Sequence, residues 1–281
     1  MSPNQRILKL LQVSDLEAEK LILGYEKDLI KAYNSALKDI KQMIADMFEK
    51  YGDQVTYKDM VAYQRLTNLE LSIAKQIKTL TGKGKRTVEK AFRDIVTESF
   101  SATGTAISKS LEVTVGFGVM NEEVIKTAIL NPMQRITWSD ALQENSAKYL
   151  SQIKTELSQG LIRGEGYARI AKRLEKSTEM SANKTIRIVR TEGHRAQSVG
   201  RKLAVDNVEG AADRLGIKIK RVWVATSDDR TRDSHKAMDG KEADDDGLFT
   251  LPSGVRTEGP GMSGVAEEDI NCRCSVRVEV S

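Results

Sequence analysis

Proline, cysteine and histidine are scarce in this sequence of 281 residues, which holds four, two and two of them, and aromatic residues make up 5%. The two cysteines, Cys272 and Cys274, exclude a disulfide framework of the kind that stabilises small secreted domains. We therefore expect thiols in a reducing compartment, or metal ligands. Two histidines leave little side-chain acid–base chemistry near neutral pH, which disfavours a catalytic role.

Long hydrophobic runs and a large excess of one charge are also missing. No segment approaches the roughly 20 apolar residues of a spanning helix, and residues 1–11 lack the basic-then-apolar order of a secretory signal. The 44 Lys and Arg against 40 Asp and Glu give a net charge of +4, which excludes a uniformly basic nucleic-acid binder. The P-loop, the glycine-rich dinucleotide fingerprint and the serine nucleophile elbow are absent, so catalysis is not indicated.

The first part of the chain, residues 1–131, is predicted to be a helical arm. No proline lies between Pro3 and Pro132, so no ring interrupts a helix there. Apolar residues recur at steps of three or four over 22–47 and 66–80, which predicts two helices packed as an antiparallel hairpin. Glycines at the ends of these stripes, in the segments 51–53 and 81–84, are expected to stop the helices, and residues 113–119 are expected to form a loop or short strand.

The second part, residues 132–281, is predicted to combine helices with a small sheet. A helix is expected to follow Trp138 and to end in a glycine-rich turn at 160–166. The segments 217–225 and 272–280 alternate apolar and polar residues, as strands do. The predicted fold class is therefore α+β and mainly helical, with an extended helical N-terminal arm and a C-terminal domain of helices plus a small β-sheet.

A long helix is expected from Ser181, as its N-cap, towards Gly210, and its two faces differ. One face carries the small residues Gly193, Ala196 and Gly200, which predicts close packing against another element. The other face carries a group of basic residues that are candidates for contacting DNA phosphates or an acidic partner: Arg187, Arg195, Arg201 and Lys202. A solvated basic surface without a ligand is the simpler interpretation.

Polar and sulfur-containing residues near the C-terminus indicate a candidate metal site. Cys272 and Cys274 lie two apart on an expected strand, so both project from one face, about 6.5–7 Å apart along it. His235 adds an imidazole, and Asp228 is one candidate for the fourth position of a tetrahedral Zn²⁺ site. Such a structural zinc ion would pin the ends of a long loop. The alternative is a polar core in which His235 forms hydrogen bonds and both thiols pack as small hydrophobes.

This region resembles the phage Mu protein F-like family, the minor head proteins of tailed phages, over residues 135–281. The resemblance rests on a glycine-rich turn at 160–166, an Arg-Thr-Glu motif at 190–192, a strand that ends in tryptophan, and the segments 228–240 and 271–274. The motif residues are Arg190, Glu192, Trp223, Asp228, Arg230, Arg232, His235 and Gly240. Residues 1–131 carry no such motif, as is typical of the variable arm of this family.

The resemblance implies a low-copy, nonenzymatic minor head protein that is made in the host cytoplasm and resides in the virion, at the head interior or portal vertex. It implies a role in head assembly and in DNA packaging or ejection, with the portal protein, scaffold, major capsid protein and non-specifically bound phage DNA as partners. Residues 1–131 would then dock on the portal or capsid, and 132–281 would be the Mu F-like domain.

Two further expectations accompany this interpretation. Some relatives carry an added toxin or enzymatic domain, and we expect none here because the sequence ends just after the last expected strand. The alternative function is a metal-dependent, nuclease-like enzyme that acts on nucleic acid through His235, Cys272 and Cys274.

Overall fold

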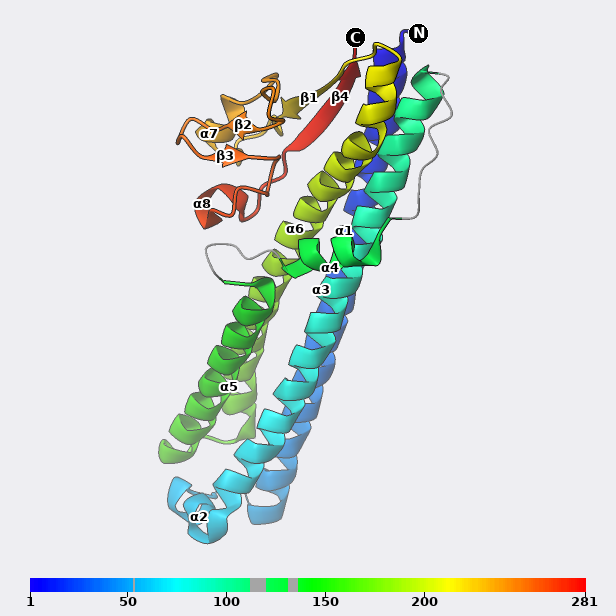
Figure 1. Ribbon diagram of the computed structural model, residues 1–281. Coiled ribbons are helices and arrows are strands. Elements are labelled where there is room, and N and C mark those ends of the chain that lie inside the picture. Colours follow the sequence, from blue (N-terminus) through cyan, green and yellow to red (C-terminus); the bar gives the residue numbers. More distant parts are fainter. Residues whose placement is uncertain (53, 112–119, 131–135) are drawn as a thin grey trace. The chain divides into compact units, whose positions relative to one another are not determined.

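The computed structural model describes residues 1–52, 54–111, 120–130 and 136–281, which form a mainly helical α+β fold, as predicted (Figure 1). The helical elements are α1 (Pro3–Tyr51), α2 (Tyr57–Val61), η1 (Ala62–Gln64), α3 (Arg65–Leu111), α4 (Glu122–Leu130), α5 (Trp138–Ile162), α6 (Tyr167–Arg214), α7 (Asp233–Lys236) and α8 (Ala266–Asp269). The strands are β1 (Ile219–Val224), β2 (Phe249–Thr250), β3 (Arg256–Thr257) and β4 (Ser275–Val280).

Two predictions fall outside the described residues: the loop or short strand at 113–119, and the boundary between residues 131 and 132. None of the described helices is both long enough and apolar enough to cross a membrane.

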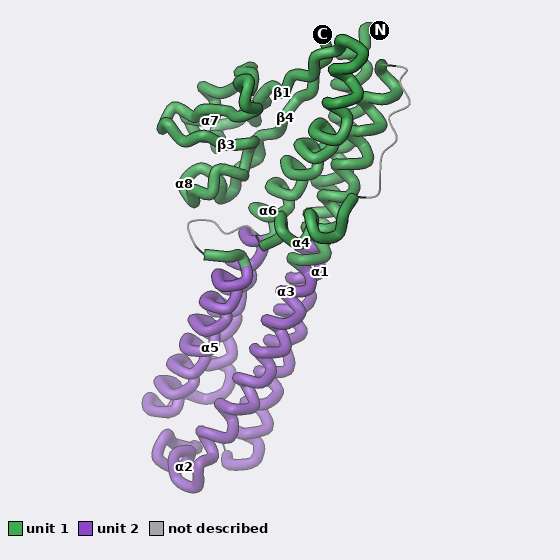
Figure 2. Tube along the Cα trace, in the orientation of Figure 1, with its two compact units in different colours: residues 1–24, 88–138, 189–281 green, residues 25–87, 139–188 purple. Residues whose placement is uncertain are grey.

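The chain divides into two compact units (Figure 2). Unit 1 comprises Met1–Gly24, Val88–Trp138 and Val189–Ser281, and unit 2 comprises Tyr25–Thr87 and Ser139–Ile188. Both units therefore take segments from the two parts expected from the sequence, 1–131 and 132–281. The long helices α1, α3 and α6 each contribute residues to both units.

Unit 2 contains the predicted helical hairpin. The apolar residues that recur at helical spacing over 33–47 of α1 and 66–80 of α3 pack together, and α5 and α6 contribute the rest of the same core. Buried polar groups within this core are paired: the Tyr33 hydroxyl lies 2.8 Å from that of Thr185, and the Tyr149 hydroxyl lies 2.7 Å from that of Thr178. Because each buried hydroxyl has a partner, these groups fix the relative rotation of the helices at little cost.

The helix stop expected at residues 81–84 is wrong, because α3 continues through them to Leu111. Two side-chain contacts explain this result. A Cβ at Gly84 would lie 3.2 Å from a methyl group of Leu142, so the glycine allows α5 to approach closely. The Thr81 hydroxyl donates to the carbonyl of Ile77 at 2.8 Å, one turn earlier in the same helix. Tertiary packing thus outweighs the low helix propensity of the glycines.

The helix start expected at Ser181 is also wrong. The turn expected at 160–166 is confined to residues 163–166, because α5 continues to Ile162, and α6 already begins at Tyr167. Ser181 is buried inside the helix, where the Asn145 side chain donates to its carbonyl oxygen at 2.9 Å and contacts its hydroxyl at 3.1 Å. A side-chain hydroxyl that could cap a helix is used here to bind a neighbouring helix.

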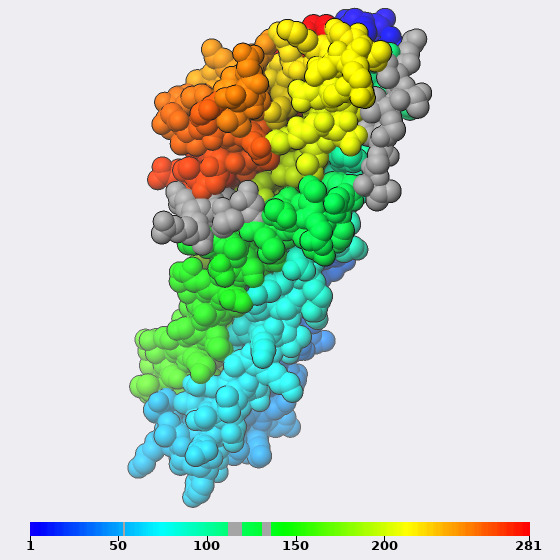
Figure 3. Space-filling view, viewed as in Figure 1, coloured from blue at the N-terminus to red at the C-terminus, as the bar shows by residue number. Residues whose placement is uncertain are grey.

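In unit 1, the small residues of α6 permit the close packing that the sequence predicted. A Cβ at Gly193 would lie 2.7 Å from Ile22 of α1, and a Cβ at Gly200 would lie 2.6 Å from the carbonyl oxygen of Val96 in α3. Beside these helices, β1 and β4 pair antiparallel, with Trp223 opposite Val276. Figure 3 shows the C-terminal segment, orange to red, lying against the yellow part of α6.

The strands are shorter than expected. β1 and β4 form one two-stranded sheet, and β2 and β3 form another. β4 begins at Ser275, so Cys272 and Cys274 precede the regular strand. Residues 225–274, which we call the C-terminal lobe, contain only the two-residue strands β2 and β3 and the four-residue helices α7 and α8. The small apolar core of the lobe also takes in one residue of β1 and one of β4, and it comprises Trp223, Ala225, Met238, Phe249, Leu251, Cys272, Cys274 and Val276.

Candidate functional site

The side chains of His235, Cys272 and Cys274 converge in the core of the C-terminal lobe. His235 lies on α7, and the two cysteines lie in the segment that leads into β4. The Nδ1 atom of His235 is 3.5 Å from the Sγ atom of each cysteine, and the three donor atoms all lie within 4.8 Å of one another. Each residue is only 2–3% exposed. The structure therefore brings together the three residues that the sequence singled out.

Glu268 holds the other side of the imidazole. Its Oε2 atom lies 3.1 Å from Nε2 of His235 and accepts from the Ser234 hydroxyl, while Oε1 accepts from Ser253 at 3.0 Å. One carboxylate thus connects α8 to α7 and to the turn between β2 and β3. With Nε2 facing a carboxylate, Nδ1 is directed at the two sulfur atoms.

Aromatic rings and a glycine turn shape the same core. The Trp223 ring lies 5.4 Å from the His235 ring and 5.3 Å from the Phe249 ring, both edge to face. Gly240 has φ +74°, a conformation that favours glycine, and its N–H donates to the Trp223 carbonyl at 2.9 Å. This turn returns the chain to β1, which explains why tryptophan and glycine belong to one motif.

The hydrogen bond between the two thiols makes their proton affinities differ. Accepting it from Cys272 lowers the pKa of Cys274, and donating it raises the pKa of Cys272. His235 and the backbone of Thr226 lower the pKa of Cys274 further.

Asp228 does not join this cluster, so the proposal that it is a metal ligand is corrected. Its two oxygens accept from the Arg273 guanidinium at 2.5 and 2.7 Å. That bidentate pair, with the Thr231 hydroxyl and the Arg230 N–H, holds the pKa of the Asp228 carboxyl well below its usual range. Arg230 also lies 3.8 Å from Asp228, but its side chain is 79% exposed. Asp228 is therefore a positioning group for the segment that carries the cysteines.

The remaining motif residues bind other parts of unit 1. Arg232 donates to the carbonyl of Ile270 at 2.5 Å, which ties α7 to the end of α8. Glu192 accepts from Nε of Arg195, one turn later on α6, at 2.8 Å. Burial raises the pKa of the Glu192 carboxyl despite this neighbour. Arg190 is exposed on α6 and engaged in an interaction of its own.

The basic face expected on α6 is corrected, because two of its four members are buried. Arg195 donates to the carbonyl of Ala128 at 2.6 Å and lies over the Phe92 ring. Arg201, which is 2% exposed, donates to the carbonyl of Val276 at 2.7 Å and forms an ion pair with Asp15. These guanidinium groups bind elements of unit 1 to one another and do not face solvent.

The other two members of that set differ from each other. Lys202 lies 2.6 Å from Asp206 and 3.3 Å from Glu258, and its side chain is 23% exposed. Arg187 is exposed on the part of α6 that belongs to unit 2. Of the four DNA-binding candidates, Arg187 alone keeps an exposed side chain.

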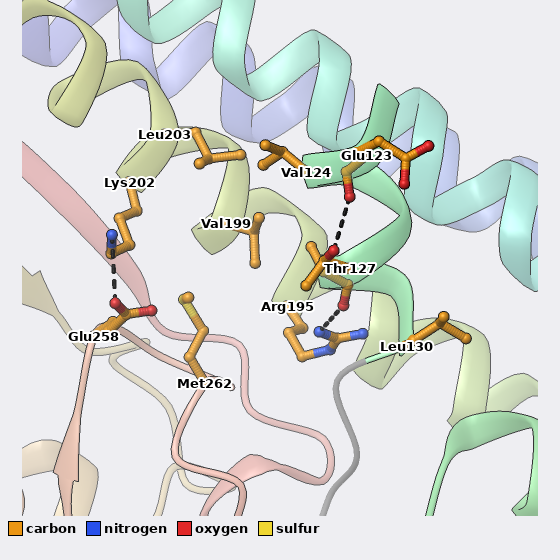
Figure 4. Close-up of a pocket in the computed structure, with 11 residues that line it drawn as sticks. Glu123, Val124, Thr127, Leu130, Arg195, Val199, Lys202, Leu203, Glu258 and Met262 are labelled. Carbon is orange, nitrogen blue, oxygen red and sulfur yellow. Dashed lines mark hydrogen bonds and ion pairs between the residues drawn. The ribbon is translucent and has the colours of Figure 1, made fainter. Parts of the chain in front are cut away.

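A groove of about 790 Å³ lies in unit 1 between α4, α6 and the C-terminal lobe (Figure 4). Apolar side chains that include Leu203 and Met262 line it, and the Lys202–Glu258 ion pair closes one edge. Arg195 lies at its wall with the guanidinium directed to α4. The groove is separate from the His235 cluster and contains none of its residues.

Sequence reasoning missed two residues of the cluster's surroundings. One is Glu268, which orients His235. The other is Arg273, which pairs with Asp228. A signal for it was present, since a residue between two inward-facing neighbours on an extended segment points the other way. Its partner, Asp228, lies 45 residues earlier in the sequence, and patterns of helix or strand spacing do not relate residues that far apart.

Comparisons with known proteins agree with the earlier resemblance. The family described as "Phage Mu protein F like protein" matches residues 151–277. The chain is 33% identical over 269 residues to the minor head protein GP7 of Bacillus phage SPP1, across 93% of this chain and 84% of that protein. It is 29% identical over 254 residues to the NAD(+)--arginine ADP-ribosyltransferase EFV of Enterococcus faecalis, across 89% of this chain but 50% of that protein.

No solved structure matches the chain. The family match contains His235, Cys272 and Cys274, so the cluster lies within the shared region. The similarity to the SPP1 protein extends over nearly the whole chain. The chain therefore belongs to the phage Mu protein F-like family of phage minor head proteins.

Proposed function

We propose that this minor head protein is built into the phage head at the portal vertex and acts in head assembly and in DNA packaging or ejection. The observation that carries the proposal is the similarity to the SPP1 minor head protein over 93% of this chain and 84% of that protein. A similarity of that extent includes both compact units, so the shared role belongs to the whole chain and not to one lobe.

The burial of the candidate site favours this role over a metal-dependent nucleic-acid enzyme. His235, Cys272 and Cys274 are 2–3% exposed, so a phosphate of DNA or RNA has no access to them. A hydrolytic metal site needs an open coordination position that the substrate reaches. The second relative is named as a transferase, but this chain spans half of its length. We therefore assign the cluster a structural role.

We propose that the strained tip, residues 57–64 of α2 and η1, contacts the portal protein. Tyr63 and Gln64 have φ values of +60° and +56°, although neither is glycine. Such residues cost of order 1–3 kcal/mol each and are often found at functional sites. Tyr63 is 84% exposed and Val61 is 51% exposed. Exposed aromatic and aliphatic side chains on a fixed turn are suited to anchoring a protein partner.

The experiment that tests this role measures retention of the full chain on immobilised portal protein of the same phage. We expect Tyr63→Ser to weaken retention about tenfold or more, because an aromatic anchor is lost. Leu71→Ser is the matched control, since Leu71 is 63% exposed in unit 2 but lies outside the strained tip. If both variants and the original chain are retained equally, the contact between residues 57–64 and the portal protein is disproved. The role in the phage head is tested separately, and absence of the protein from procapsids and virions would disprove it.

We propose that the protein contacts phage DNA through its phosphates. Arg187 is the exposed member of the original basic set, and the net charge of +4 favours a weak and local contact. Binding of this kind weakens steeply as salt is raised and does not depend on base sequence. Titrations of mixed-sequence DNA at several salt concentrations, with Arg187→Gln as the variant, measure both properties.

A further inference from the structure

We infer that His235, Cys272 and Cys274 bind one structural Zn²⁺ ion, which holds the C-terminal lobe together. Imidazole nitrogen and thiolate sulfur are the ligands that zinc prefers, and a mixed set of this kind selects it over Mg²⁺ or Ca²⁺. All three residues are buried in the core of a lobe whose strands have two residues and whose helices have four.

The distances from Nδ1 of His235 to the two sulfur atoms fit the spacing of ligands in a tetrahedral zinc site. Zn–S bonds of about 2.3 Å and Zn–N bonds of about 2.0–2.1 Å place neighbouring sulfur and nitrogen ligands about 3.6 Å apart at the tetrahedral angle. The two observed distances from Nδ1 of His235 to the sulfur atoms are both 3.5 Å. The imidazole nitrogen is therefore already at the distance from each sulfur atom that a shared zinc ion requires, and the two sulfur atoms lie within 4.8 Å of each other.

Hydrogen bonds outside the cluster hold each ligand in the orientation that a metal needs. Glu268 lies 3.1 Å from Nε2 of His235, which leaves Nδ1 as the atom that faces the sulfurs. Carboxylate partners of this kind accompany metal-binding histidines and fix the ring. The Arg273 side chain pairs with Asp228 and so points away from the cluster. Cys272 and Cys274, which flank Arg273 in the sequence, therefore point into the cluster.

The backbone around the cysteines is fixed in the same way. The Thr226 hydroxyl donates to the carbonyl of Arg273 at 2.7 Å, and the N–H of Cys272 donates to the carbonyl of Asp269 at 3.1 Å. The segment that carries two of the ligands is thus attached both to the end of β1 and to α8 before any metal binds.

The C-terminal lobe has too small an apolar core to be stable without a further cross-link. Its core contains eight buried residues, two of which are the cysteines themselves, and between β1 and β4 the chain runs for 50 residues with little regular structure. A core of this size contributes little stability. A zinc ion that joins α7 to the segment before β4 would close this long loop, and the energy of binding would become energy of folding.

The test begins with metal analysis of the full chain, expressed in a reducing cytoplasm and purified without added metal. We expect about one zinc ion per chain. Cys272→Ser and His235→Asn should lose it. His194→Asn is the matched control, because His194 is the second histidine of the chain and lies outside the three-residue cluster, and it should keep the ion. Loss of zinc from the control, or its retention by both cluster variants, would contradict the inference.

A second measurement needs no variant and so remains decisive if the cluster variants fail to fold. After zinc is removed from the original chain by a chelator, added Co²⁺ should give the intense near-ultraviolet thiolate-to-cobalt bands and visible bands of tetrahedral coordination. The melting temperature should fall by several degrees on removal and recover with added zinc. A chain that is folded, lacks zinc and shows no such cobalt bands would overturn the inference.

Glu268→Ala separates the positioning role of Glu268 from general stability. Loss of an outer hydrogen bond to a ligand typically weakens metal affinity about 10–100-fold while the ligands remain. We expect Glu268→Ala to bind one zinc ion at saturation, with an affinity reduced by that factor in competition with a chelator. Unchanged affinity would show that the carboxylate does not orient His235.

Discussion

Asn271 shows how a single residue sets the direction of the segment that carries the cysteines. It has φ +58°, and its N–H donates to the Thr191 hydroxyl of α6 at 3.2 Å. Asparagine tolerates this conformation better than most residues, whereas a β-branched residue does not. We expect Asn271→Val to lower the free energy of unfolding by about 1–2 kcal/mol.

Asn271→Gly is the control for that prediction, because glycine adopts a positive φ without steric cost. Its effect should lie within about 0.5 kcal/mol of zero. Urea unfolding of both variants measures the difference. If the two substitutions destabilise the protein equally, the side-chain amide matters and the backbone conformation does not.

At this scale the sequence identified the central residues of the cluster but not all of their partners. Cys272 and Cys274 were found because alternation along an extended segment shows which side chains share a face, and His235 because an imidazole is a ligand that suits the same metal. Asp228 was misassigned as a metal ligand because the sequence does not show that its carboxylate pairs with Arg273. Arg195 was placed on an exposed face because residue type alone does not reveal that α4 covers it.

Among the elements, α6 provides a direct test of close helix packing. A Cβ at Gly200 would lie 2.6 Å from the carbonyl oxygen of Val96 and 3.0 Å from the N–H of Phe100, both backbone atoms of α3. Backbone atoms in a helix do not move aside as a flexible side chain does. We therefore expect Gly200→Ala to destabilise the protein by about 1–3 kcal/mol, measured by urea or thermal unfolding.

Gly210 supplies the matched control on the same helix, because a Cβ there would have no atom within 4 Å. Gly210→Ala should stabilise the protein by about 0.5–1 kcal/mol through higher helix propensity alone. Opposite signs for the two substitutions would support the packing argument. A stabilising effect of Gly200→Ala would refute it, since propensity would then dominate at both positions.

The helix boundaries illustrate why elements are harder to predict than patterns. The apolar stripes over 22–47 and 66–80 were found correctly, because a period near 3.6 residues is a property of the sequence itself. The stop at 81–84 and the start at Ser181 were wrong. Glycine often stops a helix and serine often caps the start of one, but here both residues lie inside a helix and contact α5. Gly84 leaves room for Leu142, and Ser181 binds Asn145.

For the whole molecule, the interleaved course of the chain decides which fragments fold. Unit 2 consists of residues 25–87 and 139–188, and its single core joins apolar residues of α1 and α3 to those of α5 and α6. The fragment 1–131 lacks the second segment, so the apolar faces of its two long helices would be open to water. We expect this fragment to aggregate or to melt without a cooperative transition, as measured by size-exclusion chromatography and circular dichroism.

The complementary piece makes that prediction specific. Residues 25–87 joined by a flexible Gly/Ser linker to 139–188 contain the whole core of unit 2, so this fusion should be monomeric and should unfold cooperatively. Mixing fragment 1–131 with fragment 132–281 during refolding should likewise restore a cooperative transition, because each supplies the apolar face that the other lacks. A monomeric fragment 1–131 with a cooperative transition of its own would instead establish it as an independent arm, as the scarcity of proline and the helical period first suggested.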